Sequence, residues 1–274
     1  MIELPESYTL IDQINKEISG KIIVKAEANH TAHAFALYTG DPVEYNEKLA
    51  GKTIICADVY SGSVRIKADD MIIIITTPIR YHKKNAKLPD KHQLYLEFED
   101  ATAITCTVQM WGSFLCFREG DMNGIPKQYT INTNPSPLEQ EFDEKFFRDL
   151  LHKEKLSSLS AKAFLTTEQR IPGVGNGVAQ DILYKAKIHP KRKMSTLSEE
   201  ELNVLFNTLK SILLDIWKKG GRDTEYDLYG CKGGYKTIMS KYSVNKPCPV
   251  CNTLITKESY LGGSIYLCEN CQKM

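Results

Sequence analysis

The chain has 274 residues, of which 42% are hydrophobic and 25% charged, and its formal net charge is only +1. These values are typical of a soluble globular protein with room for two domains and a small appended module. The longest strongly apolar run, Met71 to Ile75, suffices only for a strand, and the opening MIELPESYTL lacks the features of a secretory signal. We therefore expect no membrane association and a cytoplasmic location, with the nucleoid as the site of action if the protein is bacterial.

The N-terminal half is predicted to be a β-domain with a leading helix. Apolar residues at near-helical spacing predict a helix between Glu6 and Ile18. Runs rich in Ile, Val, Thr and Tyr, bounded by turn residues, predict strands at 21–28, 52–60, 71–77, 92–98 and 103–111. An antiparallel β-sandwich over residues 1–131 is the expected architecture, in an α+β protein of several domains.

A linker-like stretch at 132–137 (NTNPSP) precedes a helical part. Asp143 can cap one helix, and a second short helix fits residues 157–164. A glycine-rich turn then feeds a helix that is expected to stop at Pro190. Ser198 and Glu201 form a capping box for a helix through about Lys218, which Gly220 and Gly221 end. The expected domains are a helical one at 138–242 and a zinc finger at 243–274.

Four of the eight cysteines have the spacing of a zinc site. CPVC is followed by sixteen residues and then CENC, so two C-x-x-C pairs can place four thiolates around one tetrahedral Zn²⁺. The predicted ligands are Cys248, Cys251, Cys268 and Cys271. A closed four-sulfur site is structural, so function has to come from what the finger presents to a partner.

Two further features have both a functional and a plainer interpretation. The turn GVGNG (173–177), which contains Gly175 and Asn176, would expose backbone N–H groups to an anion at a helix N-terminus, or it is an ordinary turn. Residues 185–246 hold 13 Lys and Arg against 7 Asp and Glu, among them Lys191, Arg192 and Lys193, which fits a phosphate-facing surface or a solvated one.

The acidic start around Glu3, Pro5 and Glu6 is also ambiguous. It is either an exposed, frayed terminus or an α-amino group beside a carboxylate, a pair that can act as nucleophile and acid/base partner.

Taken in order, these segments resemble the formamidopyrimidine-DNA glycosylase/endonuclease VIII family. The resemblance rests on ELPE (3–6), AKAFL (161–165), QRIPGVGNGVAQDILYKAKIHP (169–190), GGRDTEYDLYGCKGGYKTIMSKY (220–242) and CPVC…CENCQ (248–272). It implies base-excision repair by a monomer that binds double-stranded DNA with damaged or abasic sites, flips the damaged base out and removes it.

The resemblance also implies roles for individual residues. The family's nucleophile is the amine of an N-terminal proline, which forms a Schiff base and nicks the strand by β/δ-elimination. Glu3 would be the proton shuttle and Glu6 the second glutamate of the motif. Phosphate contacts are implied for Lys162, Gly175, Asn176 and Tyr235, and the zinc is structural.

The sequence departs from the family pattern at four places. Ile2 stands where the family has proline, and a bulky second residue blocks removal of Met1, so any nucleophilic amine would be that of Met1. Gly62-Ser63 replaces a glycine-lysine pair, Gly262-Gly263 replaces the finger's glycine-arginine pair, and 75–81 (ITTPIRY) differs from the family's loop.

Three hypotheses follow from these departures. The protein is a relative with eroded catalytic residues that recognises damaged or bent DNA without cutting it, or it remains a DNA glycosylase/AP lyase that uses the Met1 amine or another group with Glu3. A zinc-ribbon protein with another polymeric partner, such as RNA, is the third possibility.

Overall fold

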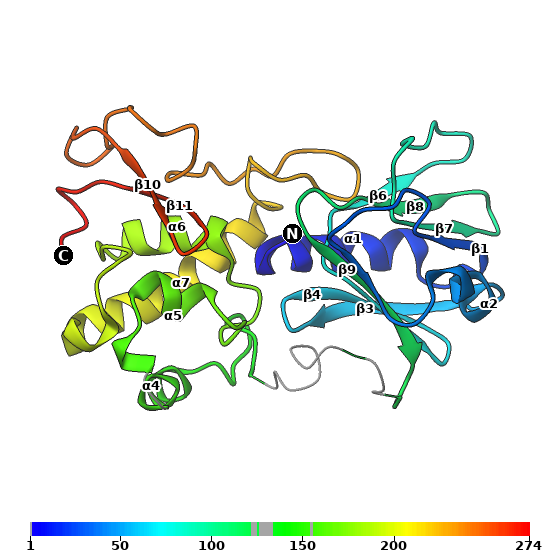
Figure 1. Cartoon of the computed structure of the whole chain (residues 1–274), viewed down its shortest axis with the longest axis horizontal. Helices are drawn as coiled ribbons and strands as arrows, with labels where there is room; N and C mark the ends of the chain where they lie inside the picture. Colours follow the sequence, from blue (N-terminus) through cyan, green and yellow to red (C-terminus); the bar gives the residue numbers. More distant parts are fainter. Residues whose placement is uncertain (1, 122–124, 126–133, 154–155) are drawn as a thin grey trace. The chain divides into compact units, whose positions relative to one another are not determined.

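The computed structural model describes residues 2–121, 125, 134–153 and 156–274. The chain folds into two compact units, of which one comprises Met1–Ile131 and Lys219–Gly234 and the other Asn132–Lys218 and Tyr235–Met274 (Figure 1). This division differs from the three expected ranges, because a segment late in the chain returns to the first unit.

The first unit contains a leading helix and two β-sheets, so the α+β fold with an N-terminal sandwich is confirmed. It begins with α1 (Leu4–Ile18). One sheet is antiparallel with the order β1-β7-β8-β6, made of Ile23–Ala28, Leu94–Phe98, Ala103–Cys106 and Ile79–His82. The other has the order β2-β9-β5-β4-β3, made of Ala36–Tyr38, Gly112–Arg118, Met71–Ile75, Ser63–Ala68 and Ile54–Tyr60. A short 3-10 turn, η1 (Pro42–Glu44), and α2 (Tyr45–Leu49) follow β2.

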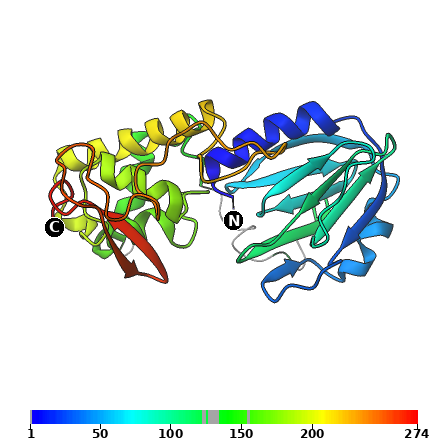
Figure 2. The ribbon, with the colours of Figure 1, turned by 90° about the horizontal axis from the view of Figure 1, so that it is seen from above.

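The core of this unit lies between the sheets and against α1. Leu10, Ile14 and Ile18 belong to the same buried cluster as the inward side chains of both sheets. Figure 2 shows α1, in blue, running along one side of the strands, and α1 contacts β3 and β4. Every residue of β5 is buried, because Ile72 and Ile74 pack in a second cluster on its other face. This packing anchors the chain start, which leads directly into α1.

The second unit is helical and ends in a β-hairpin. Its elements are α4 (Glu144–His152), η2 (Leu156–Ser158), α5 (Ala161–Thr166), α6 (Asn176–Lys185), η3 (Met194–Thr196), α7 (Glu199–Lys218), β10 (Thr256–Tyr260) and β11 (Gly263–Leu267). The predicted caps are confirmed: the Asp143 carboxylate accepts from the Phe146 amide at 2.7 Å. The Ser198 hydroxyl likewise accepts from the Glu201 amide at 3.2 Å, and the Glu201 carboxylate accepts from the Ser198 amide at 2.8 Å.

Some boundaries differ from the prediction for local reasons. The helix expected at 157–164 is interrupted at Ser160, which is extended and whose hydroxyl caps α5 through the Ala163 amide at 3.2 Å. Helix α6 ends before Pro190, because Lys187 adopts a left-handed conformation with φ of 59°. Strands β2, β4, β6 and β9 of the first unit and strands β10 and β11 of the second unit were not predicted individually. Within the described part of the chain, no helix is long and apolar enough to cross a membrane.

Candidate functional site

Glu3 and Glu6 lie at the start of α1 and are buried, with exposed fractions of 9% and 4%. Ile2 places its side chain in the core of the first unit, and its backbone N–H donates to the Thr76 carbonyl oxygen at 3.1 Å. The terminus is therefore ordered from Ile2 onward, which excludes a frayed acidic tip at Glu3 and Glu6. Met1 lies outside the described residues.

Arg222 binds both carboxylates. Its Nε donates to Glu6 Oε1 at 2.8 Å and its Nη2 donates to Glu6 Oε2 at 3.0 Å, while its backbone N–H donates to the same Oε1 at 3.2 Å. Its Nη1 lies 3.5 Å from Glu3 Oε2. The two-point contact is the strong geometry for an arginine–carboxylate pair, and here it is buried, since both side chains are 5% exposed.

The charges in this cluster are unequal. Burial alone would lower the pKa of Arg222, but the carboxylates of Glu3 and Glu6 outweigh it and raise this pKa above its usual value. Nearby, burial raises the pKa of Glu225, while Arg222 acts in the opposite direction. One guanidinium thus faces two buried carboxylates, with a third close by, and its single positive charge does not balance them.

Glycines place Arg222 in this position. Gly221 has a φ of +100°, a conformation that favours glycine. A Cβ on Gly233 would lie 2.1 Å from the carbonyl carbon and oxygen of Gly221, so the two backbones touch. The returning segment 219–234 is therefore closely packed where it delivers Arg222 to the start of α1.

The turn between β3 and β4 carries the Gly62-Ser63 pair. Ser61 and Gly62 both have positive φ, of 50° and 78°, and Tyr60 pairs with Ser63 across the turn. The Ser7 hydroxyl donates to the Gly62 carbonyl oxygen at 2.7 Å, which fastens the turn to α1. Ser63 is buried, so the position where the resembled family has a lysine holds a small neutral side chain.

In the second unit, Lys162 and Asn176 both contact the β10–β11 hairpin. Lys162 Nζ donates to the Tyr260 carbonyl oxygen at 2.7 Å and lies 5.8 Å from the centre of the Tyr260 ring. Asn176 Nδ2 donates to the Ser264 carbonyl oxygen at 3.2 Å, and Gln180 Nε2 donates to the same oxygen at 2.9 Å. Burial lowers the pKa of Lys162. Two residues implied as phosphate contacts therefore lie beside the same hairpin.

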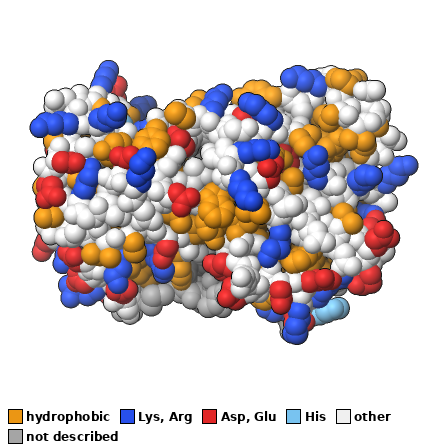
Figure 3. All heavy atoms as spheres, turned by 180° about the vertical axis from the view of Figure 1, so that it is seen from behind, with side chains coloured by type: hydrophobic (Ala, Val, Ile, Leu, Met, Phe, Trp, Pro, Cys, Tyr) orange, Lys and Arg blue, Asp and Glu red, His pale blue; other side chains and the backbone are white. Residues whose placement is uncertain are grey.

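Gly263 of the hairpin faces these two residues. A Cβ at this position would lie 3.5 Å from Lys162 Nζ and 3.8 Å from the Asn176 side chain, which is ordinary van der Waals contact. The position of the family's finger arginine thus lies next to both polar side chains. On the face drawn in Figure 3, basic and acidic side chains are interspersed, so charge alone does not single out a site there.

The glycine turn before α6 is built as the sequence predicts. Gly173 has a φ of +70°, and its N–H donates to the Gln169 side chain at 3.0 Å. Gly175 is the extended N-cap residue, and Asn176 is the first residue of α6. Tyr235 is 4% exposed, so its ring lies within the fold rather than on the surface.

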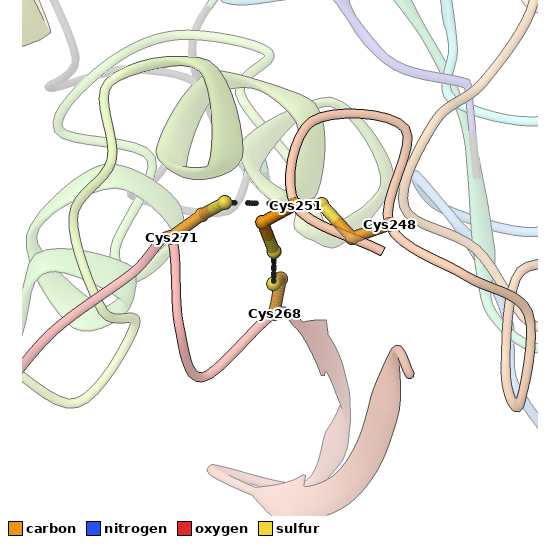
Figure 4. A group of neighbouring side chains, drawn as sticks. All are labelled: Cys248, Cys251, Cys268 and Cys271. Atoms are coloured by element: carbon orange, nitrogen blue, oxygen red, sulfur yellow. Dashed lines mark hydrogen bonds between the residues drawn. The ribbon is translucent and has the colours of Figure 1, made fainter. Parts of the chain in front are cut away.

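The four cysteines predicted as ligands converge (Figure 4). The sulfur atoms of Cys251 and Cys268 are 3.3 Å apart, and those of Cys248 and Cys271 are 3.8 Å apart. Sulfur atoms around a tetrahedral Zn²⁺ with bonds of about 2.3 Å are separated by roughly 3.8 Å. The donor set and its spacing therefore fit one metal ion.

Neighbouring side chains orient this cluster. The Tyr184 hydroxyl of α6 lies 3.1 Å from Cys248 Sγ. Hydrogen bonds from Thr253 and Asn270 lower the pKa of the Cys251 thiol to about 5, which favours the thiolate. Gln272 accepts from the Cys268 amide and donates to the Ile188 carbonyl oxygen, each at 3.1 Å. The cluster is thus attached to the helical part of its own unit.

Sequence reasoning missed Arg222 and Gln180. Arg222 lies in segment 220–242, which resembles the family as a whole. The signal for its role is that two glutamates near a buried helix start need a cation. Gln180 is one turn after Asn176 on α6, which is the spacing that places two side chains on one helix face.

Comparison with known proteins agrees with this geometry. Residues 133–226 match the formamidopyrimidine-DNA glycosylase H2TH domain. The chain is 27% identical to the formamidopyrimidine-DNA glycosylase of Lactococcus lactis, over all of both chains. It is 28% identical to that of Legionella pneumophila, covering 99% of this chain and 98% of that one.

Solved structures give the same result. The Lactococcus lactis Fpg in complex with DNA containing an abasic site matches 99% of this chain and 100% of its own, with a TM-score of 0.84 and 25% identity. The MutM (Fpg) protein of Thermus thermophilus matches 98% of both chains with a TM-score of 0.81, and at 22% identity it shows the fold alone.

Proposed function

Because this chain belongs to the formamidopyrimidine-DNA glycosylase/endonuclease VIII family, we propose that it is a damaged-DNA-binding protein of base-excision repair whose catalytic residues are eroded. Its ligand is double-stranded DNA that carries a damaged or abasic site. It acts as a monomer in the compartment that holds the chromosomal DNA, the cytoplasm in a bacterium.

The observation that carries this proposal is the contact of Arg222 with Glu3 and Glu6. A proton shuttle needs a carboxylate whose oxygens can reach the substrate, whereas a buried guanidinium that binds a carboxylate occupies those oxygens. Glu6 accepts three hydrogen bonds from Arg222, and Glu3 lies within ion-pair distance of the same side chain. This arrangement opposes proton transfer by either residue.

The nitrogen of residue 2 is equally unsuited to attack a sugar carbon. A family nucleophile is a terminal amine, whereas the Ile2 nitrogen donates to the Thr76 carbonyl oxygen and its side chain is packed in the core. Removal of Met1 would therefore expose an amine already engaged in the fold. Together with Ser63 and Gly263 in place of two cations, this supports binding without efficient cleavage.

Binding itself is assigned to the second unit. Lys162, Asn176 and the N-terminal turn of α6 surround the hairpin position 263, and amide N–H groups at a helix start favour a phosphate. We assign Gly175 to the same phosphate contact and Tyr235 to the packing that supports it. A structural Zn²⁺ held by Cys248, Cys251, Cys268 and Cys271 keeps the hairpin in place.

A second candidate function is an AP lyase that uses the amine of Met1. It is favoured by one observation: Glu3 is retained and lies two residues after Met1 in a buried site. A primary amine can form a Schiff base, so the missing proline does not remove this chemistry.

Paired binding and nicking assays test the proposal. Two duplexes of one sequence, one of them with a single abasic site, are compared by fluorescence anisotropy and by gel analysis of strand integrity. We expect tighter binding to the abasic duplex and an intact strand. Equal affinity for both duplexes would contradict lesion recognition, and efficient nicking would favour the lyase.

A further inference from the structure

Three side chains in the first unit, Glu27, His30 and His92, form a cluster that the features above do not use. Glu27 is on β1, His30 follows that strand, and His92 precedes β7. One possible ligand atom from each residue lies within 4.8 Å of the others, and among the described residues only the four cysteines form another such group. The cluster therefore needs a chemical explanation of its own.

The backbone around this cluster is held in place on both sides. The Asn29 amide donates to the Gln93 carbonyl oxygen at 2.8 Å, and the Thr31 amide donates to the His92 carbonyl oxygen at 3.1 Å. The Gln93 side chain also donates to the Thr31 carbonyl oxygen at 2.9 Å. The turn after β1 and the segment before β7 are thus joined, so the three side chains start from a defined geometry.

His92 has the hydrogen bond that typifies a metal-binding imidazole. Its Nδ1 lies 3.2 Å from the Pro89 carbonyl oxygen, and since a carbonyl only accepts, Nδ1 carries the proton. In the neutral ring Nε2 then carries the lone pair. His92 is only 6% exposed, and its Nε2 has no hydrogen-bond partner in the described structure. A buried lone pair without a donor is suited to a cation.

The other two ligands are adjacent and adjustable. His30 Nδ1 lies 2.7 Å from Glu27 Oε1, at hydrogen-bond distance. The proton between these two atoms occupies a position that a metal cation could take. The rings of His30 and His92 stack at 4.4 Å with an angle of 4° between their planes. The His30 ring has to turn for both nitrogens to face one ion, and its side chain is 45% exposed, which leaves it room. Among the described ion pairs, Lys25 is the one cation besides His30 that competes with a metal ion for the Glu27 carboxylate; its Nζ lies 3.5 Å from Glu27 Oε2.

We propose that Glu27, His30 and His92 bind a divalent transition-metal cation such as Zn²⁺ or Ni²⁺. The ligands are a Glu27 carboxylate oxygen, His30 Nδ1 and His92 Nε2, with water in the remaining positions. Two imidazoles and one carboxylate are a donor set for such ions rather than for Mg²⁺ or Ca²⁺, which prefer oxygen ligands. The ion joins the end of β1 to the segment before β7.

Titration of the zinc-loaded full chain with Ni²⁺ tests this proposal by calorimetry, with released zinc measured in parallel. We expect one equivalent of Ni²⁺ to bind without zinc release. His92→Asn keeps a donor for the Pro89 carbonyl but lacks Nε2, and it should weaken binding at least about ten-fold, as should His30→Ala. The matched control is His152→Ala, at an exposed histidine of the second unit, which should bind as the parent does.

Histidine ring signals in an NMR spectrum give a second readout that needs no variant. Paramagnetic Ni²⁺ at one equivalent should broaden the signals of His30 and His92 and leave those of His152 sharp. Absence of a binding heat, unchanged affinity in His92→Asn, binding only with loss of zinc, or equal broadening of all histidines would each overturn the proposal.

Discussion

The Arg222 guanidinium and the Glu6 carboxylate, 216 positions apart in the chain, form a buried pair with donor–acceptor distances of 2.8 and 3.0 Å. Glu3 adds a second carboxylate at 3.5 Å from the same guanidinium. The family resemblance implies a proton shuttle at Glu3 and a second glutamate of the motif at Glu6, and in this chain the two carboxylates share one internal cation. This relationship links the stability of the first unit to its proposed loss of catalysis.

Arg222→Met should strongly destabilise the first unit. It leaves Glu3 and Glu6 buried without their cation, and breaking a buried pair by removal of one partner costs roughly 3–5 kcal/mol. Urea unfolding measures the loss. The matched control is Arg65→Met, whose partner Asp58 is 48% exposed, and this variant should lose less than about 1 kcal/mol. Equal losses in both variants would show that the buried pair has no special role.

Asn176→Ala should weaken DNA binding by a similar factor for every duplex sequence. The residue begins α6 beside Lys162, and a phosphate contact carries no base information. Loss of one such hydrogen bond corresponds to about 1–2 kcal/mol, or roughly 5- to 30-fold in affinity. Fluorescence anisotropy on several duplexes checks this, with Asn207→Ala on the exposed face of α7 as control. An unchanged affinity would remove Asn176 from the binding surface.

Gly263→Arg should strengthen DNA binding. A Cβ atom fits at this position in ordinary van der Waals contact, next to Lys162 and Asn176. A charge-assisted hydrogen bond to phosphate contributes about 1.5–3 kcal/mol, so affinity should rise roughly ten-fold or more. Gly263→Ala also replaces the glycine but adds no cation, so its DNA affinity should match that of the parent protein. If the arginine variant binds no better, the hairpin does not face DNA.

Zinc removal should abolish DNA binding while the first unit stays folded. The four cysteine sulfurs have a spacing that suits Zn²⁺. Without the ion they are no longer joined, so β10 and β11 lose the metal link that holds them against α6. Cys248→Ser and chelator treatment are compared by metal analysis and anisotropy. Cys231→Ser, at an exposed cysteine outside the cluster, is the control and should retain both zinc and binding. Intact binding after confirmed metal loss would contradict the role given to the finger.

Local signals in the sequence predicted much of this structure. Asp143 and the pair Ser198 and Glu201 cap their helices as expected, because a cap depends on residues three positions apart. Each C-x-x-C pair is likewise local, and the presence of two such pairs at zinc-site spacing predicted the sulfur cluster. Strand β9 was missed, because its polar start Gly112-Ser113 does not show the alternation of a half-buried strand.

Relationships between distant segments could not be read in this way. The pairing of Arg222 with Glu6 depends on the return of 219–234 to the first unit, which no local pattern encodes. The convergence of Glu27, His30 and His92 depends likewise on the antiparallel pairing of β1 with β7. Family resemblance identified which residues to examine, but only the contacts show that Glu3 and Glu6 share a cation.

Borohydride trapping tests the proposed loss of catalysis most directly. The protein is incubated with a duplex that carries one abasic site, reduced with borohydride, and analysed by mass spectrometry, while a gel shift on the same sample measures binding. We expect bound DNA and no covalent adduct, because the family's N-terminal proline is absent and the two glutamates beside the chain start are held by Arg222. An adduct at the Met1 amine that disappears after N-terminal acetylation would contradict this account and make the protein an AP lyase.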